Sequence, residues 1–455
     1  MAKQKRQIRM KVQVNALEQI NLHAAGIDVG AEEMYVAVAS DRDTQSVRSF
    51  PTFTADLRRL AEWLKACQIK TVAMEATGVY WIPLYELLEE EGFEVCLVNA
   101  RHLKNVSGRK TDVLDCQWIQ QLHTYGLLRP SFRPPEQIVA IRCLVRHREM
   151  LVQYRSAHIQ HMQKALTLMN VRLTNVLSDI TGVTGLKIIR AILAGERNPK
   201  QLAQFRDERC KKSQAEIAKS LEGHYKREHV FALKQALELY DFYDQQLQAC
   251  DAELEAMYQE FDPPEDPGTP PPAPRTQKRR KNQAHFDLAP ALYRLTGVDL
   301  TQIDGVDELT VQKVLSETGI DMSKWPTVKH FTSWLHLCPN TKITGGKVIQ
   351  TGVQPTKNRA SAALRVAAAS LKTSDSALGA YFRRMRARLG TPAAITATAH
   401  KLARIIYFML KHRMPYHDFG ADYYDQQHRD RVLRNLNRRA ARLGFRLEPA
   451  VPEVS

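Results

Sequence analysis

Residues 24–30 read Ala-Ala-Gly-Ile-Asp-Val-Gly, and the expected architecture of the first part of the chain follows from them. They lie in a β-rich segment, residues 23–40, in which apolar residues alternate with others. A turn at residues 31–33 makes this segment a predicted hairpin. Asp28 stands among apolar neighbours in the first strand, where an unpaired carboxylate would be costly. The pattern therefore predicts a strand that carries a functional acid.

Strands and helices alternate in the residues that follow. The expected helices cover residues 57–66, 85–91 and 112–125, and the expected strands cover residues 71–74 and 94–99. Such alternation indicates an α/β sheet. In sheets of this kind, functional groups gather where the strands end.

Three further acids fall in this part of the chain. Glu75 follows a buried strand, whereas Asp112 and Asp115 are three residues apart in a predicted helix and share one face. A helix cap by Thr111, together with the helix dipole, is an alternative explanation for these two aspartates. With Asp28, the four acids favour a site for two metal ions about 4 Å apart. Oxygen-only ligands suit Mg²⁺ or Mn²⁺ rather than zinc.

The composition of the chain narrows the possible partners and compartments. The formal net charge is +16, which predicts a partner rich in phosphate, although a basic surface without a partner is the alternative. The seven cysteines form no Cys-x-x-Cys pair, as expected of reduced thiols in the cytoplasm. The chain shows neither a secretion signal nor a run of about 18 apolar residues. We therefore expect a cytoplasmic protein with no membrane contact.

Two long segments, residues 138–173 and 230–257, carry apolar residues at steps of three or four. They are predicted helices that either pair as an antiparallel coiled-coil arm, within one chain or between two, or form ordinary helical core. Residues 261–282 are rich in proline and end in a basic cluster, which predicts an extended linker.

Three motifs in the first part of the chain together resemble a known family. They are Gly-Ile-Asp-Val-Gly (26–30), Met-Glu-Ala-Thr-Gly-Val-Tyr-Trp (74–81) and Lys-Thr-Asp-Val-Leu-Asp (110–115). In this order they are similar to the DEDD transposases of the insertion-sequence 110 family, over about residues 22–175 and again over about residues 298–415. The resemblance implies an RNase H-like, RuvC-like α/β catalytic domain. It also implies that the metal-binding acids are Asp28, Glu75, Asp112 and Asp115.

The expected organisation of the chain follows from the patterns and the resemblance together. It comprises a basic tail (1–21), a RuvC-like catalytic domain (22–130), a helical coiled-coil region (131–260), a proline-rich basic linker (261–285), a mostly α-helical transposase domain (286–415) and a basic tail (416–455).

The transposase domain is expected to begin with a helix, a tight turn at Gly305 and a second helix from about Glu308. This order resembles a helix-hairpin-helix, whose turn amides can approach a phosphate. The family usually has Pro-Gly-x-Gly where this chain has Asp304-Gly305-Val306-Asp307, and the two acids would repel a phosphate. The turn therefore either contacts DNA or only packs helices.

A glycine-rich loop further on, Ile-Thr-Gly-Gly-Lys (343–347), is expected to expose Thr344 unless it is an ordinary surface turn. Family members carry a nucleophilic serine before a glycine in this loop, five residues after a proline that matches Pro339. The resemblance therefore implies Thr344 as the nucleophile, with a methyl group that restricts χ1. Ser361 lies in a small-residue helix and is expected to pack. A changed nucleophile and an inactive copy remain open.

Cationic side chains accumulate after residue 340. The predicted nucleic-acid contacts are Lys347, Lys357, Arg359, Arg365, Arg383, Arg384, Arg386 and Arg388. A solvated helix face is the alternative for each of them. A last helix is expected at residues 430–443, with Arg434, Arg438, Arg439 and Arg442.

The resemblance implies a transposase that cuts and rejoins DNA with Mg²⁺ or Mn²⁺ and a protein hydroxyl. The implied partners are DNA at the element ends and target, an element-encoded guide RNA, and further copies of the chain in a homodimer or homotetramer. The alternatives are a RuvC-like structure-selective nuclease that uses water, and a non-catalytic nucleic-acid-binding protein. A third is an actin-like ATPase or sugar kinase, but the second Asp-Gly-Gly loop of those folds is missing.

Overall fold

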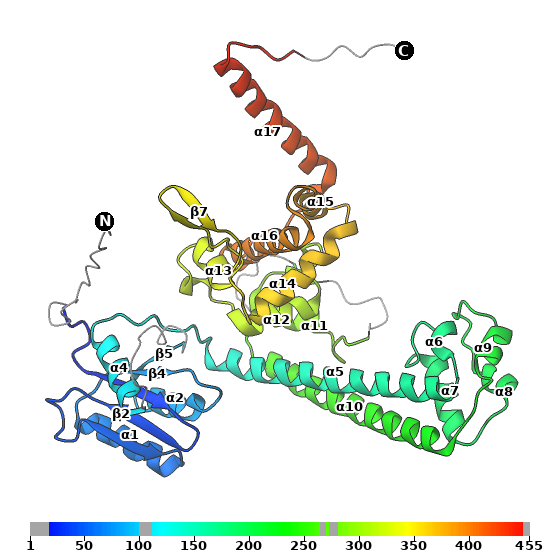
Figure 1. The fold of residues 1–455 in the computed structure, drawn as a ribbon, viewed down its shortest axis with the longest axis horizontal. Helices are drawn as coiled ribbons and strands as arrows, with labels where there is room; N and C mark the ends of the chain where they lie inside the picture. The colour runs from blue at the N-terminus through cyan, green and yellow to red at the C-terminus, as the bar shows by residue number, and fades with distance from the viewer. Residues whose placement is uncertain (1–17, 100–111, 264–269, 273–280, 449–455) are drawn as a thin grey trace, which may run out of the picture. The chain divides into compact units, whose positions relative to one another are not determined.

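The computed structural model describes residues 18–99, 112–263, 270–272 and 281–448 (Figure 1). The chain divides into two compact units, Met1–Arg133 and Pro134–Ser455, which are described separately. Among the described residues, no helix combines the length and the apolar character needed to cross a membrane.

The first unit is built on a five-stranded mixed sheet whose strand order is β3-β2-β1-β4-β5. Its strands are β1 (Ala24–Val29), β2 (Glu33–Ala37), β3 (Val47–Pro51), β4 (Thr71–Glu75) and β5 (Glu94–Val98). The first three are antiparallel, whereas β1, β4 and β5 run parallel. This confirms the predicted RNase H-like class of α/β sheet. Strand β3 was not expected, because polar residues interrupt it and it gains its hydrogen bonds only by pairing with β2.

The described helices of this unit lie on opposite faces of the sheet. They are α1 (Thr54–Ala66), α2 (Trp81–Glu90) and α4 (Asp112–Thr124). Leu60 and Leu64 of α1 and Leu84 of α2 pack into one apolar core with Ile27 and Met74 of the sheet. Helix α4 covers the other face, where Ile119 forms a small buried core with Ala73 and Val98.

The second unit contains the predicted arm. Helices α5 (Glu136–Leu168) and α10 (Arg227–Gln259) each have 33 residues and pack along one another. The buried Arg148 pairs with Asp251, while Arg155, seven residues later, pairs with Asp244, seven residues earlier. The helices are therefore antiparallel, and they pair within one chain. The apolar stripe expected to run to residue 173 instead ends with α5, because the chain turns at Asn170, whose φ is 57°.

Four short helices connect the two arm helices at one end, and we call them the arm tip (Figure 1). They are α6 (Leu173–Val176), α7 (Val183–Leu193), α8 (Pro199–Ala203) and α9 (Gln214–Ser220). Ile188, Leu202 and Ile217 form a core there with Leu166 of α5 and Leu237 of α10. The predicted helical region therefore includes a small folded module that apolar periodicity alone does not distinguish.

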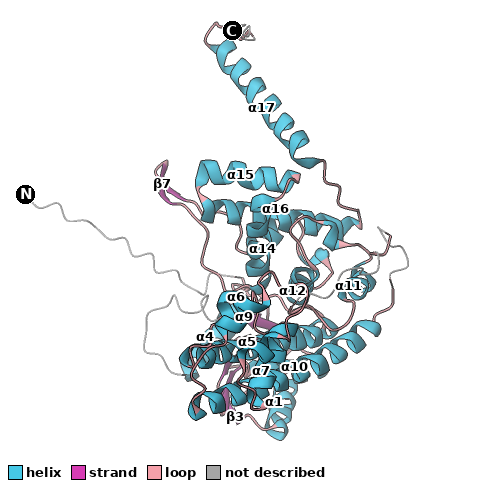
Figure 2. Cartoon of the chain, turned by 90° about the vertical axis from the view of Figure 1, so that its right-hand side faces the viewer, coloured by secondary structure: helices cyan, strands magenta, loops and turns pink. Residues whose placement is uncertain are grey.

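The rest of the second unit is mostly helical, as predicted (Figure 2). It contains α11 (Leu288–Thr296), α12 (Glu308–Thr318), α13 (Val328–Trp334), α14 (Arg359–Ser370), α15 (Ala377–Leu389) and α16 (Thr391–His412). A two-stranded hairpin, β6 (Lys342–Thr344) and β7 (Lys347–Gln350), separates α13 from α14. Trp325, Phe331 and Tyr407 form an aromatic core beneath these helices.

The last helix, α17 (Gly420–Arg442), begins ten residues before the expected start at residue 430. Its first turns gain support from α15, which no local pattern in the sequence reveals. None of the residues of α17 is buried.

Candidate active site

Two of the four predicted acids lie side by side near the carboxyl ends of two neighbouring inner strands of the sheet. Strands β1 and β4 are parallel neighbours, and Ile27 of β1 is in register with Met74 of β4. The next residue on each strand is an acid, Asp28 on β1 and Glu75 at the end of β4. Both side chains are partly exposed. The Glu75 carboxylate accepts a hydrogen bond from the Thr77 hydroxyl at 3.0 Å.

The same two acids face α4. Ile27 and Met74 belong to the core beneath α1 and α2. Because side chains alternate along a strand, Asp28 and Glu75 point to the opposite face. Helix α4 packs so closely there that a Cβ on Gly26 would overlap backbone atoms of Cys116 and Gln120. Glycine at position 26 therefore lets α4 lie directly on β1, two residues before Asp28.

The remaining acids belong to the first turn of α4. The helix begins at Asp112, and Asp115 follows three residues later with a partly exposed side chain. Burial, and then the negative charge of Asp28, raise the pKa of the neighbouring Cys116 thiol to about 12, with a smaller contribution from Asp115. Asp28 and Asp115 are thus both close enough to act electrostatically on one buried thiol.

The fit of these residues to a divalent cation rests on their chemistry and their convergence. All four predicted ligands are carboxylates, which suit Mg²⁺ or Mn²⁺. The side chain of Asp112 lies outside the described residues. Within the described part of the chain, no group of three or more His, Cys, Asp or Glu side chains is arranged to hold a metal ion. Strands β1 and β4 and helix α4 nevertheless bring carboxylates together on the face of the sheet that α4 covers.

Thr344 lies at the tip of an exposed hairpin. It ends β6 and pairs with Lys347 of β7 across the two-residue turn Gly345-Gly346. Both glycines have positive φ, 56° and 76°, as two-residue hairpin turns of this kind require. Every side chain from residue 341 to 349 is exposed. The expected exposure of the Thr344 hydroxyl is therefore observed, on a hairpin rather than an irregular loop.

Ser361 is not accessible to DNA. It lies in the first turn of α14 and is completely buried, with a hydroxyl that lacks a hydrogen-bond partner in the described structure. The prediction that this serine packs is confirmed.

The turn at Gly305 packs against α14. Gly305 has φ 77°, and a Cβ there would come within 2.9 Å of the carbonyl oxygen of Ala367. Asp307 caps α12 through a 2.8 Å bond from the amide of Thr310. Burial, and then the charge of Asp418, raise the pKa of Asp304. The helix expected directly before Gly305 is only a 3₁₀ turn, Leu300–Gln302. The close contact of Gly305 with α14 and the cap from Asp307 favour a role of the Gly305 turn in helix packing.

The eight predicted cationic contacts differ in their availability. Lys347, Lys357, Arg386 and Arg388 are exposed. The other four are engaged or partly covered. Arg359 pairs with Glu149 of α5 at 2.6 Å, and Arg383 donates to the Ser374 carbonyl at 2.5 Å. Arg384 lies over two tyrosine rings, and Arg365 is half-buried.

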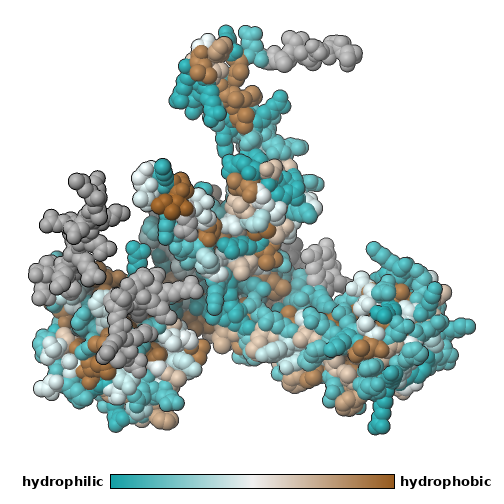
Figure 3. Space-filling model, viewed as in Figure 1, coloured by the Kyte–Doolittle hydropathy of each residue, from teal (hydrophilic) through white to brown (hydrophobic). Residues whose placement is uncertain are grey.

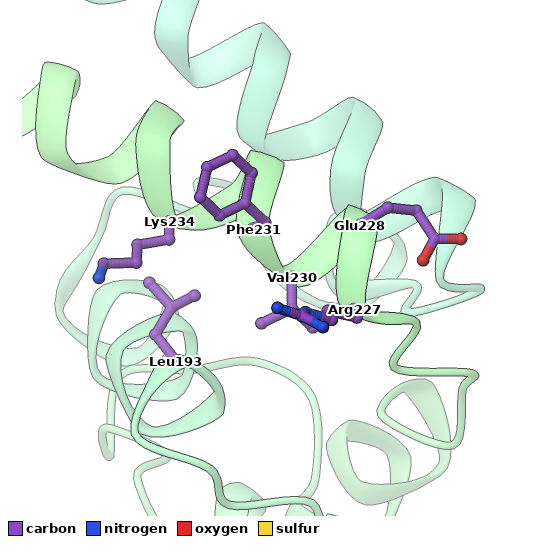
Figure 4. Close-up of a pocket in the computed structure, with 6 residues that line it drawn as sticks. All are labelled: Leu193, Arg227, Glu228, Val230, Phe231 and Lys234. Atoms are coloured by element: carbon purple, nitrogen blue, oxygen red, sulfur yellow. The ribbon is translucent and has the colours of Figure 1, made fainter.

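A hollow in the arm belongs to neither predicted catalytic region. It lies between the end of α7 and the first turns of α10 and is lined by Leu193, Arg227, Glu228, Val230, Phe231 and Lys234 (Figure 4). Glu228 is the single carboxylate of this lining, so the hollow offers no paired acids for metal binding.

Sequence reasoning missed the close contact between β1 and α4, which Gly26, Cys116 and Gln120 form. Gly26 lies inside the first motif, and a small residue two positions before a strand acid is the one signal that points to a close helix approach. Cys116 and Gln120 follow Asp112 at steps of four, the spacing of a helix face that packs on a sheet.

Two family models match the chain. Residues 25–171 match the transposase model for DEDD enzymes of IS110 type, which covers all five strands, α4 and α5. Residues 299–383 match the model described as transposase IS116/IS110/IS902 family, which covers the Gly305 turn and the Thr344 hairpin. A comparison with curated proteins gave no match. The chain belongs to the IS110 family of transposases, enzymes that cut and join DNA.

Proposed function

We propose that this transposase cuts DNA by attack of the Thr344 hydroxyl on a phosphodiester that would be positioned by divalent cations bound to Asp28, Glu75, Asp112 and Asp115. The observation that supports the proposal best is the convergence of β1, β4 and the first turn of α4 on one face of the sheet. The exposure of Thr344 at a hairpin tip is consistent with it.

The four acids would hold Mg²⁺ or Mn²⁺ through oxygen ligands. When bound, such ions help to activate an attacking oxygen and stabilise a leaving one at phosphorus. The contribution of the chain is to orient the ligands. Asp28 and Glu75 extend from paired strands, and Asp115 extends from a helix whose backbone contacts β1.

Thr344 would supply the nucleophile. Its Oγ1–H bond breaks as an Oγ1–P bond forms, and the bond from phosphorus to the 3′ oxygen breaks. The 3′ oxygen gains a proton, which leaves a free 3′-hydroxyl and a strand joined to the protein. In the described part of the second unit, neither a carboxylate nor an imidazole hydrogen bonds to Thr344. The hairpin carries no Asp, Glu or His, so a carboxylate or an imidazole that accepted this proton would come from outside it.

The assembly would contain two or four chains. One chain has one acid set and one Thr344, whereas transposition acts on two DNA molecules. The excess of positive charge would also accommodate an element-encoded guide RNA that selects the target. Rejoining would then proceed by strand exchange through a four-way junction.

A reconstituted reaction tests the proposal. The full-length protein, with its co-purified RNA, is incubated with DNA that carries the element ends and with Mg²⁺. We expect protein-linked DNA on denaturing gels that a protease converts to free strands, and recombinant junctions that disappear after RNase treatment. Junctions that survive RNase would contradict the guide RNA.

The same reaction tests the second candidate, a structure-selective nuclease that uses water. One observation favours it: Thr344 stands where the family is expected to carry serine, and its own hairpin carries no Asp, Glu or His. Cleavage without any protein-linked strand would support the nuclease and contradict Thr344 as the nucleophile.

A further inference from the structure

The C-terminal part of α17 extends away from the rest of its unit (Figures 1 and 2). Every side chain from Arg431 to Arg439 is exposed, and no residue of the helix is buried. The exposed stretch from Arg431 to Arg439 is shorter than the roughly 12 to 15 residues below which an isolated helix is marginal in water, so a surface that it binds would stabilise it. The helix also lies beyond residues 299–383, the second region matched to the transposase family.

The start of α17 is firmly attached. The Tyr424 ring meets the Tyr381 ring of α15 edge-on at 6.1 Å. The Arg384 guanidinium lies 5.0 Å from the Tyr424 ring centre, and the Lys401 ammonium lies 5.0 Å from it. The Ala421 amide also donates to the Asp375 carbonyl at 3.1 Å. These contacts fix the direction in which the exposed part of the helix leaves α15 and α16.

The exposed part is strongly basic. Residues 428–442 contain six arginines and one aspartate. Arg431, Arg434, Arg438 and Arg442 recur at steps of three, four and four, so they form one line along the helix, which we call the arginine face. Among the described residues, none of these four makes an ion pair with a carboxylate. The Arg434 side chain donates only to the Asp430 carbonyl of its own helix, at 3.3 Å.

Apolar side chains occupy the opposite side of the helix. Leu433 and Leu436, and Leu443 directly after the last helical residue, are 46%, 44% and 75% exposed. They recur at steps of three and seven, out of phase with the arginine face, and Figure 3 shows apolar side chains along this helix. The two faces can therefore be altered independently.

We propose that the arginine face of α17 binds the phosphate backbone of duplex DNA, with the helix lying along the major groove. Four guanidinium groups on one line, which have no carboxylate partner in the part of the chain that the structure describes, complement a polyanion. The major groove of B-form DNA admits an α-helix, whereas that of A-form RNA is too deep and narrow. The inference rests on the proposed function in one respect, that DNA is the substrate, and adds a contact outside the matched catalytic regions.

The test compares DNA binding by the full-length protein with that of a variant that carries Arg431→Gln, Arg434→Gln, Arg438→Gln and Arg442→Gln. Affinity for a fluorescent DNA duplex is measured by anisotropy over a range of salt concentrations. We expect affinity to fall at least about tenfold, and the slope of log affinity against log salt to become shallower by roughly 3 to 4. An unchanged slope would overturn the proposal.

Two matched variants separate charge from structure. Lysine at the same four positions keeps the charge, so binding should stay within a few-fold of the wild type. Glutamine at Leu433, Leu436 and Leu443 changes the other face and should leave the salt slope unchanged. Circular dichroism checks the helix, which glutamine supports about as well as arginine does. A loss of binding in the leucine variant equal to that in the arginine variant would contradict the proposal, because the apolar face would then control binding.

A duplex RNA of the same sequence gives the remaining comparison. If the four arginine-to-glutamine substitutions weaken binding to duplex RNA more than binding to duplex DNA, the choice of DNA as the partner is overturned. The experiment measures binding and not chemistry. A wild-type protein that binds DNA with the expected slope but forms no protein-linked strand would contradict Thr344 chemistry and leave the role of α17 intact.

Discussion

The two regions that carry the proposed chemistry are held in opposite ways. Asp28 lies between Ile27 and Val29, which are almost inaccessible, and the α4 backbone packs against Gly26 beside it. Thr344 lies on a hairpin whose apolar side chains, including Ile343 and Ile349, are themselves exposed. The core therefore positions the acids, whereas a turn alone positions the hydroxyl.

Substitution of one of the acids held by the core should have the largest effect on DNA cleavage. Asp28→Asn keeps the shape of the side chain but loses the charge that would hold the cation. We expect DNA cleavage to fall by about 1000-fold or more, because metal-ion stabilisation contributes several kcal/mol. Cleavage rates on element-end DNA with Mg²⁺ measure this.

Asp41→Asn is the matched control, because this exposed aspartate lies in the same unit and, among the residues that the structure describes, forms an ion pair with Arg42 alone, at 4.0 Å. A similar loss of activity in both variants, or activity retained in Asp28→Asn, would remove the catalytic role of Asp28.

Substitution of the hydroxyl tests the other region. Thr344→Ala should abolish the protein-linked strand while the melting temperature stays near that of the wild type, because the side chain makes no buried contact. Thr344→Ser should retain the linkage, since it keeps the hydroxyl and removes only the methyl group. Denaturing gels with and without protease report the linkage. Normal linkage in Thr344→Ala would identify another nucleophile.

Because the core holds the acids but not the hairpin, substitutions in the two regions should change stability unequally. Gly26→Ala, in the core region, should be destabilising. Its methyl group would overlap backbone atoms of α4, which cannot rotate away. We expect the free energy of unfolding of the first unit to fall by at least about 2 kcal/mol, with a parallel loss of cleavage. Calorimetry and cleavage assays measure the two effects.

Gly182→Ala provides the comparison, because its new methyl group would lie 3.3 Å from the nearest atom and its φ is an ordinary −75°. Equal losses of stability in the two variants would argue against close packing of α4 on β1.

The hairpin glycine should show the smallest effect on stability. Gly345→Ala meets no atom within 4 Å, but it strains a residue at φ 56° by about 1 kcal/mol. We expect slower formation of the protein-linked strand and a melting temperature within a few degrees of the wild type. A large fall in the melting temperature would show that the hairpin is tied to the core after all.

Much of the first unit could be predicted from the sequence, because its signals are local. Alternating apolar residues identified β1 and a short apolar run identified β4, and the acids at positions 28 and 75 follow directly from those strands. Strand β3 could not be identified in this way, since its polar residues are stable only in hydrogen bonds to β2. The beginning of α17 was missed for a related reason, because Tyr424 is held by Tyr381 and Arg384 of another helix.

The cationic residues show the limit of sequence reasoning about sites. Arg383 and Arg386 are three residues apart on one helix, yet Arg383 donates to the Ser374 carbonyl while Arg386 is exposed. A count of charges identifies a basic region, but it does not show which side chains are already engaged, as Arg359 is by Glu149 of α5.

The sequence by itself determined strands β1, β4 and β5, the two long arm helices, the positions of the four acids along the chain, the excess of positive charge and the family. These are carried by short motifs and by periodicity, which depend on neighbouring residues. Only the tertiary structure decided that α4 lies against β1 at Gly26, that the arm pairs within one chain through Arg148 and Asp251, and that α17 exposes four arginines. Those features depend on contacts between residues far apart in the chain, and local patterns carry no information about such contacts.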